Sequence, residues 1–312
     1  MSRTRLLRCV GPGAVVALGS GGAGLALLGC GGDQLITLGS TAPDPLFYDA
    51  GRSVGVINGE ASDEQPTLTE DLLEIYFSSQ RPGLGGGDVW FATRATRAER
   101  FAVPRPVLAA SSTGTETSPA ISRDGLTLWV GSDRAGGAGK LDIWRTTRSS
   151  RDSTWGPLVN VVELNSDEDD IPRPLAQGET VMPLASGREG GVYQVYFASR
   201  ANVDAAFGVP EPVLELQREQ SRVADPFLSE DGLFLFFSRQ GESGDDDLYL
   251  AWRSRADQPF LDEIPLGAVN TGGNDRSPWV GADDTRFFFS SDRQPELSFD
   301  VFATNLDLPP FE

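Results

Sequence analysis

The chain has 312 residues, with 36 glycines, 21 prolines and 17 phenylalanines but only two methionines, and its formal net charge is −19. This composition favours many short strands joined by turns, and so acidic a chain disfavours nucleic acid as a partner. The chain contains no histidine, which excludes Ser-His-Asp and Cys-His catalysis, histidine general bases and the ordinary zinc sites. We expect an all-β protein without a cofactor.

The first thirty residues differ in composition from the rest. Three arginines precede an apolar stretch, residues 10–29, and no acidic residue occurs before Asp33. A basic region followed by an apolar one is typical of an export signal. The stretch ends in Leu27-Leu28-Gly29-Cys30, which resembles the lipobox of bacterial lipoproteins. A membrane-spanning anchor is the alternative, because about 20 apolar residues can cross a bilayer.

The lipobox resemblance implies three parts in the chain. Residues 1–29 are a cleaved signal peptide, residues 30–46 are the lipidated Cys30 with a flexible tether, and residues 47–312 are the folded domain. Gly31 follows the cysteine, which by the same analogy implies transfer to the outer membrane, facing the periplasm or the cell surface. Membrane contact then comes through the lipid alone. The only other cysteine, Cys9, leaves with the signal peptide, so we expect no disulfide.

A repeat organises the chain beyond residue 60. Five prolines recur at intervals of 53, 53, 54 and 52 residues, namely Pro66, Pro119, Pro172, Pro226 and Pro278. The clearest copies continue with a turn at Asp124-Gly125 and at Asp231-Gly232, and an apolar strand follows. An arginine stands just after that strand in four copies, at Arg81, Arg134, Arg188 and Arg293.

A second signature follows each proline by about 22 residues and reads acid or amide, aliphatic, aromatic. Its outer positions are Asp88 and Trp90, Asp142 and Trp144, Gln194 and Tyr196, Asp247 and Tyr249, and Asp300 and Phe302. A further arginine closes the strand at Arg94, Arg148, Arg200 and Arg255. We interpret the acids as residues that fix a turn or pair with the recurring arginines, in preference to a ring of ligands. We interpret the aromatics as packing between repeats, in preference to a sugar-stacking platform.

Each repeat supplies four strands, and a lone four-stranded sheet cannot cover both of its faces. We therefore predict a five-bladed β-propeller of four-stranded blades. The fifth repeat ends too early for a fourth strand, whereas residues 47–58 have the pattern of a detached one, and Asn58 matches Asn165 and Asn270 at the other repeat boundaries. An N-terminal strand should complete the C-terminal blade and leave no open edge. Extra prolines in the third repeat predict an irregular blade there.

The order of proline, Asp-Gly turn, strand ending in Ser-Asp-Arg, glycines and Asp-Ile-Trp is similar to the WD-like propeller repeat of the TolB type. The resemblance covers about residues 47–306 and is strongest over 111–164 and 270–305. It implies a non-catalytic binding propeller of the bacterial envelope, with an envelope protein or a cell-wall component as partner. TolB has six blades and a further N-terminal domain, so its own partners do not carry over.

Carboxylates could still support catalysis. Five-bladed propellers include glycoside hydrolases, and Asp225-Pro226 resembles their Asp-Pro opening, so a carboxylate-dependent glycan-processing enzyme is the alternative function. The other repeats have Gln65, Ser118, Ile171 and Ser277 at this position, which leaves a single acid.

Acidic loops are candidate calcium ligands, because hard cations prefer oxygen. They contain Asp167, Asp169, Asp245 and Asp246, with a further pair at Asp283-Asp284. None of these loops has the ligand spacing of an EF-hand, and solvated charge is the simpler interpretation.

Overall fold

The computed structural model describes the strand residues 15–18, 25–28, 35–38 and 46–47, and then residues 49–261, 263–281, 285–294 and 298–307. The chain divides into two units, of which residues 46–307 are the larger. The smaller unit contains an antiparallel sheet of β1 (Val15–Leu18), β2 (Leu25–Leu28) and β3 (Leu35–Leu38). Cys30, the predicted lipid attachment residue, lies outside the described residues, so the signal peptide, the lipid and the tether stay predictions.

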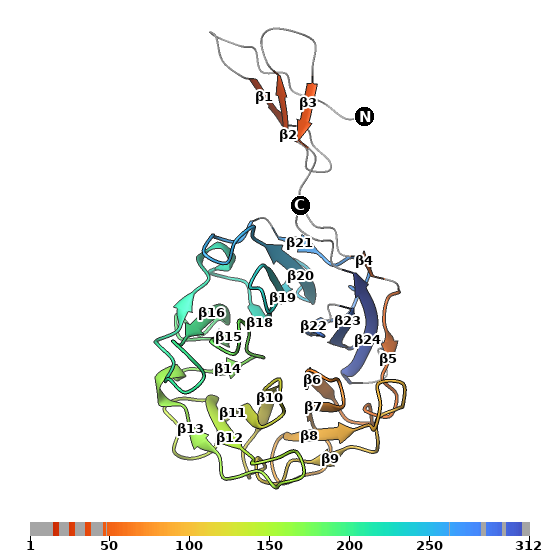
Figure 1. The fold of residues 1–312 in the computed structure, drawn as a ribbon, viewed down its shortest axis with the longest axis vertical. Coiled ribbons are helices and arrows are strands. Elements are labelled where there is room, and N and C mark those ends of the chain that lie inside the picture. The colour runs from red at the N-terminus through yellow and green to blue at the C-terminus, as the bar shows by residue number, and fades with distance from the viewer. Residues whose placement is uncertain are drawn as a thin grey trace. The chain divides into compact units, whose positions relative to one another are not determined.

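The larger unit is the predicted five-bladed propeller, and Figure 1 shows its five antiparallel sheets arranged around a central axis. Blade 1 consists of β6 (Asp63–Leu68), β7 (Glu74–Ser79), β8 (Asp88–Thr93) and β9 (Arg105–Pro106). Blade 2 consists of β10 (Glu116–Ile121), β11 (Thr127–Ser132), β12 (Asp142–Thr147) and β13 (Val159–Asn160). Blade 3 consists of β14 (Asp170–Pro172), β15 (Val181–Ser186), β16 (Gln194–Ser199) and β17 (Glu211–Pro212). Blade 4 consists of β18 (Val223–Leu228), β19 (Phe234–Gln240), β20 (Asp246–Trp252) and β21 (Ile264–Pro265).

Blade 5 closes the ring with strands from both ends of the propeller sequence. Its chain-terminal strands are β22 (Asp275–Val280), β23 (Arg286–Ser291) and β24 (Asp300–Asp307). β24 pairs with β5 (Arg52–Ser53) and with β4 (Leu46–Phe47), which confirms the predicted closure. Asn58 adds a strand-like contact, because its side chain accepts the N–H of Val301 and donates to the carbonyl of Val301, both at 2.8 Å.

Helical structure in the described part of the chain is confined to two single turns, η1 (Val162–Leu164) and η2 (Leu214–Leu216). No helix there is long and apolar enough to cross a membrane.

The innermost strand of four blades has a bulge immediately before its proline. The residues at this position are Gln65, Ser118, Asp225 and Ser277, and their φ angles are 59°, 47°, 54° and 55°. A left-handed backbone is costly for a residue with a Cβ atom, so the surrounding contacts must hold it. One such contact is the N–H of Ser118, which donates to Gln65 Oε1 of the neighbouring blade at 2.9 Å. Blade 3 is the exception, because β14 has only three residues, in keeping with its extra prolines.

An arginine joins each of four blades to the blade before it. Arg134 of blade 2 binds Glu116 Oε1 of its own innermost strand at 2.9 Å and donates to the carbonyl of Ala110, which follows the outer strand of blade 1. Its guanidinium lies 5.5 Å from the ring of Trp144. The equivalent arginine–acid pairs are Arg81–Asp63, Arg188–Asp170 and Arg293–Asp275. We call each of these arginines with its acid an inter-blade clamp.

Blade 4 lacks this clamp. Val223 stands where the other blades have the acid, and it lies opposite Arg239 in the register. Arg239 instead packs 4.1 Å from the ring of Tyr249 and pairs with Glu263 near the outer strand. Loss of the acid and displacement of the arginine therefore occur together.

We predict that Arg134→Met lowers the free energy of unfolding by about 3 kcal/mol, because it leaves the fully buried Glu116 without its cation. The double variant Arg134→Met/Glu116→Leu should lose less than the sum of the two single variants, as expected for a coupled pair. Chemical denaturation of the three variants gives this coupling. Arg255→Met is the matched control, since Arg255 is exposed and pairs with the exposed Asp257. Additive losses at Arg134 and Glu116 would contradict the clamp.

Candidate functional site

A cavity of about 290 Å³ lies on the propeller axis where the innermost strands end, and all five blades contribute to its wall. Its floor is apolar and consists of Leu68, Ile121, Leu175, Phe227, Leu228, Trp279 and Val280. Its charged side chains are Glu70, Arg123, Glu230 and Asp231. A concave apolar surface with a few convergent polar groups is the usual form of a ligand site.

The charged side chains stand on the inner turns, the loops that join the innermost strand of a blade to its second strand. In blade 4, Ser229 Oγ donates to Asp231 Oδ1 at 2.6 Å, and Gly232 follows with φ of 74°. Blade 2 repeats this geometry with Ser122, Asp124 and Gly125. The Asp-Gly pairs noted in the sequence therefore build tight turns that face the axis, because glycine takes the left-handed position and the aspartate bonds to the turn.

One arginine connects the rim of the cavity across three blades. Arg123 of blade 2 binds Glu70 of blade 1 at 2.5 Å and Glu230 of blade 4 at 2.8 Å. Blade 3 lies between blades 2 and 4, and its Gly178 N–H donates to Glu230 at 2.6 Å. The ion pairs therefore lie over the mouth of the cavity.

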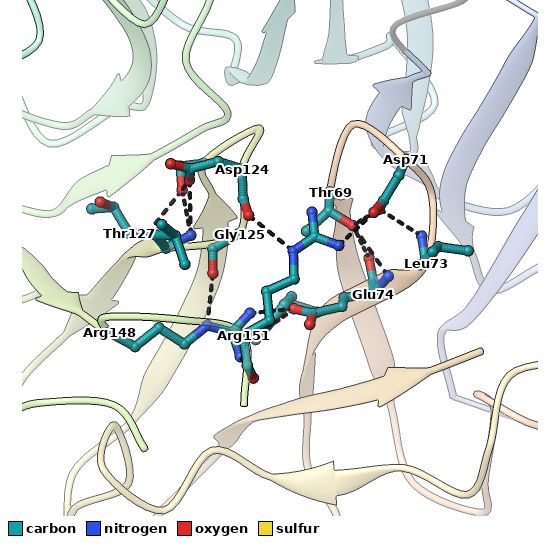
Figure 2. A network of polar contacts seen from close by, with 12 residues as sticks. Thr69, Asp71, Leu73, Glu74, Asp124, Gly125, Thr127, Arg148 and Arg151 are labelled. Atoms are coloured by element: carbon teal, nitrogen blue, oxygen red, sulfur yellow. Dashed lines mark hydrogen bonds and ion pairs between the residues drawn. The ribbon is translucent and has the colours of Figure 1, made fainter. Parts of the chain in front are cut away.

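The inner turns of blades 1 and 2 are fixed to each other by the network in Figure 2. Arg148 binds Glu74 at 2.5 Å with both side chains at least nine-tenths buried, and it donates to the carbonyl of Gly125 at 2.7 Å. Arg151 binds Asp71 at 2.5 Å closer to the surface. These contacts set the spacing between the turns that carry Glu70 and Arg123.

The arginine that closes the third strand has a constant role, which corrects one sequence assignment. Arg94, Arg148, Arg200 and Arg253 each donate Nε to a carbonyl of their own inner turn and pack on an aromatic ring. In blade 4 the equivalent residue is therefore Arg253. The prediction of Arg255 was wrong, because Arg253 follows the signature residue Asp247 by six residues, the same spacing as from Asp88 to Arg94, whereas Arg255 lies two residues further on.

Near the start of the innermost strands of blades 4 and 5, charged side chains gather around the buried Asp225. Asp225 is 3% exposed, accepts a hydrogen bond from Ser238 Oγ at 2.7 Å and lies 3.4 Å from Arg222. Burial alone would raise the pKa of Asp225, but the positive charges of Arg222 and Arg173 outweigh it and hold that pKa below its usual value. The neighbouring Asp246 is bound by two arginines, Arg222 at 2.7 Å and Arg276 at 2.6 Å.

Arg173 crosses the axis between non-neighbouring blades. It follows β14 of blade 3, and its Nη2 donates to the carbonyl of Pro278 in blade 5 at 2.9 Å. The side chain is completely buried. Since Pro174 and Trp279, the next residues in each chain segment, line the cavity, Arg173 lies between the cavity and the charge cluster.

The repeat-signature residues lie away from the cavity. Asp88 Oδ2 accepts the N–H of Leu84 at 3.0 Å, and Asp142 accepts the N–H of Gly139 at 3.3 Å, so both hold glycine-rich hairpin turns. Asp247 and Asp300 occupy the same position on β20 and β24. The recurring arginines pair instead with the acids that begin the innermost strands. The rings of Trp90, Trp144, Tyr196 and Phe302 pack against those arginines, and Tyr249 packs against Arg239.

The calcium candidates are not gathered into one site. Asp169 accepts the N–H of Leu141 and the hydroxyl of Tyr193, and Asp246 is paired with arginines. Asp167 lies in the connection between blades 2 and 3, and Asp245 lies in the loop between β19 and β20 of blade 4. No group of three acidic or other ligating side chains within the described residues has a metal-binding arrangement, and Asp283-Asp284 lies outside them.

Comparison with known proteins gives the fold but no family. No family model and no curated protein matches the chain. Among solved structures, the endo-arabinase from Bacteroides thetaiotaomicron is similar with a TM-score of 0.59 and 12% identity, covering 82% of this chain and 98% of that one. Putative TolB from Agrobacterium tumefaciens has a TM-score of 0.51 and 13% identity over 81% and 82% of the two chains.

TolB from Acinetobacter baumannii has a TM-score of 0.49 and 13% identity, and the match covers 90% of this chain but only 59% of that one. The similarities to the endo-arabinase and to putative TolB from Agrobacterium tumefaciens show the propeller fold alone, because an identity of 12–13% carries no activity across.

We predict that Asp225→Asn lowers the free energy of unfolding at pH 7 by about 3 kcal/mol, because it removes a buried anion from between arginines. The folded-state pKa of Asp225 lies below its unfolded value. The carboxylate therefore stabilises the fold above about pH 4, and this contribution is lost as the pH falls through the lowered pKa. Denaturant unfolding at a series of pH values should show the two proteins converging in acid; a gap that is constant with pH would contradict the assignment.

Proposed function

We propose that this chain is a non-catalytic binding propeller of the bacterial cell envelope, which takes part of an envelope protein or cell-wall partner into the axial cavity. The observation that carries the proposal is the cavity itself, with an apolar floor from five blades and charged side chains on the inner turns. The buried acids Asp225 and Asp246 are held by arginines and Ser238, which suits a structural role better than proton transfer.

The location rests on the N-terminal sequence. A lipid at Cys30 would hold the propeller at the outer membrane, and the chain's net charge of −19 would keep it from anionic lipid headgroups. Attachment through the lipid leaves the faces of the propeller available to partners in the periplasm or at the cell surface.

Lipid attachment predicts that the chain expressed in its bacterial host fractionates with membranes and has the mass of a diacylated protein beginning at Cys30. In Cys30→Ala both features should be lost while the propeller stays folded. Recovery of the unchanged full-length mass in the soluble fraction for both proteins would contradict the envelope location.

Use of the cavity predicts where a partner contacts the propeller. A photo-crosslinking amino acid at Glu230, on the cavity rim, should give a discrete adduct in cells, whereas the same group at Val209, exposed on the outer edge of blade 3, should not. Mass spectrometry of the adduct identifies the partner. Adducts at Val209 with none at Glu230 would place binding on the outer edge and contradict the proposal.

A carboxylate-dependent glycan-processing enzyme is the second candidate, because the chain has the fold of an endo-arabinase and two of its innermost strands carry acids, Glu64 and Asp225. The pKa of Asp225 is lowered by its arginines, whereas burial raises the pKa of Glu64. The two proposals separate in a hydrolysis assay on arabinan and on cell-wall glycans. The binding proposal requires no turnover, whereas turnover that disappears in a folded Asp225→Asn variant would establish the enzyme.

A further inference from the structure

The ion pairs over the cavity carry more negative than positive charge. Among the described residues of its wall, Glu70, Glu230 and Asp231 are the acids and Arg123 is the single base. Glu70 and Glu230 share the one guanidinium, while Asp231 accepts its hydrogen bonds from Ser229 and from the N–H of Leu233. The mouth therefore keeps an excess of negative charge after its internal pairing.

These ion pairs are positioned to exchange. The side chains of Glu70, Glu230 and Arg123 are 54%, 44% and 32% exposed, and exposed pairs contribute little net stability. By contrast, the Arg148–Glu74 pair of the adjacent network is buried and holds the inner turns in place. Arg123 can therefore leave its two acids without loss of the fold.

The apolar floor limits the size of what can enter beneath the acids. A volume of about 290 Å³ lies at the small end of ligand pockets, which run from about 300 to 1,000 Å³. It suits one bulky apolar group rather than a folded surface. Phe227 and Trp279 face each other there with ring centroids 6.1 Å apart in an edge-to-face arrangement, which offers an aromatic wall to such a group.

We propose that the cavity binds a peptide segment in which a bulky apolar side chain stands next to lysine or arginine, and that the ligand's cation displaces Arg123 from Glu70 and Glu230. Arg123 is then an internal substitute for the ligand's cation. This inference rests on the proposed binding function and adds its ligand class. The net charge of −19 acts in the same direction, because it favours the approach of cationic segments.

Three matched peptides test the ligand class by isothermal titration calorimetry: acetyl-Lys-Phe-Lys-amide, acetyl-Glu-Phe-Glu-amide and acetyl-Lys-Ser-Lys-amide. The first should bind, and the second and third should each bind at least about tenfold more weakly, since each loses one of the two contacts. Raising the salt concentration should weaken the first peptide's binding. Equal or tighter binding of the acidic peptide overturns the inference.

Variants of the rim test the displacement of Arg123. Arg123→Gln should tighten binding of acetyl-Lys-Phe-Lys-amide about two- to fivefold by freeing both acids, and Glu230→Gln should weaken it by a similar factor. Arg255→Gln is the matched control, because the exposed Arg255 pairs with Asp257 outside the cavity wall and its replacement should leave affinity unchanged. Weaker or unchanged binding in Arg123→Gln contradicts displacement.

The outcomes separate this inference from the proposed function. If phenylalanine peptides bind without regard to charge, the ligand class is wrong while the cavity remains a binding site. If none of the three peptides binds, the ligand class is again wrong. A crosslink at Glu230 in cells then still decides whether the cavity meets a partner.

Discussion

The guanidinium of the inter-blade clamp is the contact on which the propeller most depends. Neighbouring blades pack their apolar faces against each other. This packing fixes the distance between two blades but not the angle or the register between them. The clamp adds direction, because one planar cation must meet a buried acid in its own blade, a carbonyl after the preceding blade's outer strand and an aromatic ring. In blade 5, Arg293 also donates to the carbonyl of Ala50 at 2.5 Å, so the last clamp joins the two ends of the propeller sequence.

The axial site follows from closure of the ring. Once five innermost strands surround one axis, their inner turns meet, although they lie about 53 residues apart in sequence. The acidic residues of these turns then lie around the apolar floor of the cavity. Blade 4 also contributes a charge near the axis. It has Asp225 at the bulge position, where the other bulged strands have an uncharged residue, and Asp225 pairs with Arg222. The charged groups near the axis therefore come from residues that differ from one repeat to the next.

The fold could be predicted from the sequence because the residues that define a blade recur in most or all of the five repeats. Prolines, Asp-Gly turns and the acid–aliphatic–aromatic signature gave blade number and strand order, and Asn58 indicated the closing strand. The clamp could be predicted only in part. Its arginines recur in the sequence, but we expected them to pair with the signature acids, whereas they pair with the acids that begin the innermost strands. The acids that begin the innermost strands vary more along the sequence than the signature acids such as Asp88 and Asp142. Asp63 and Glu116 differ in side chain, and blade 4 has Val223 at this position.

The cavity could not be predicted from the sequence, for a related reason. Glu70, Arg123 and Glu230 occupy the same place in their turns but differ in charge, and only the ring brings them together. The measurement that most directly tests displacement of Arg123 is a crystal structure of the protein with acetyl-Lys-Phe-Lys-amide. Displacement predicts the phenyl ring against Phe227 and Trp279, a lysine amine paired with Glu70 or Glu230, and Arg123 released. A peptide on the outer edge of a blade, with Arg123 still bound to both acids, would contradict it.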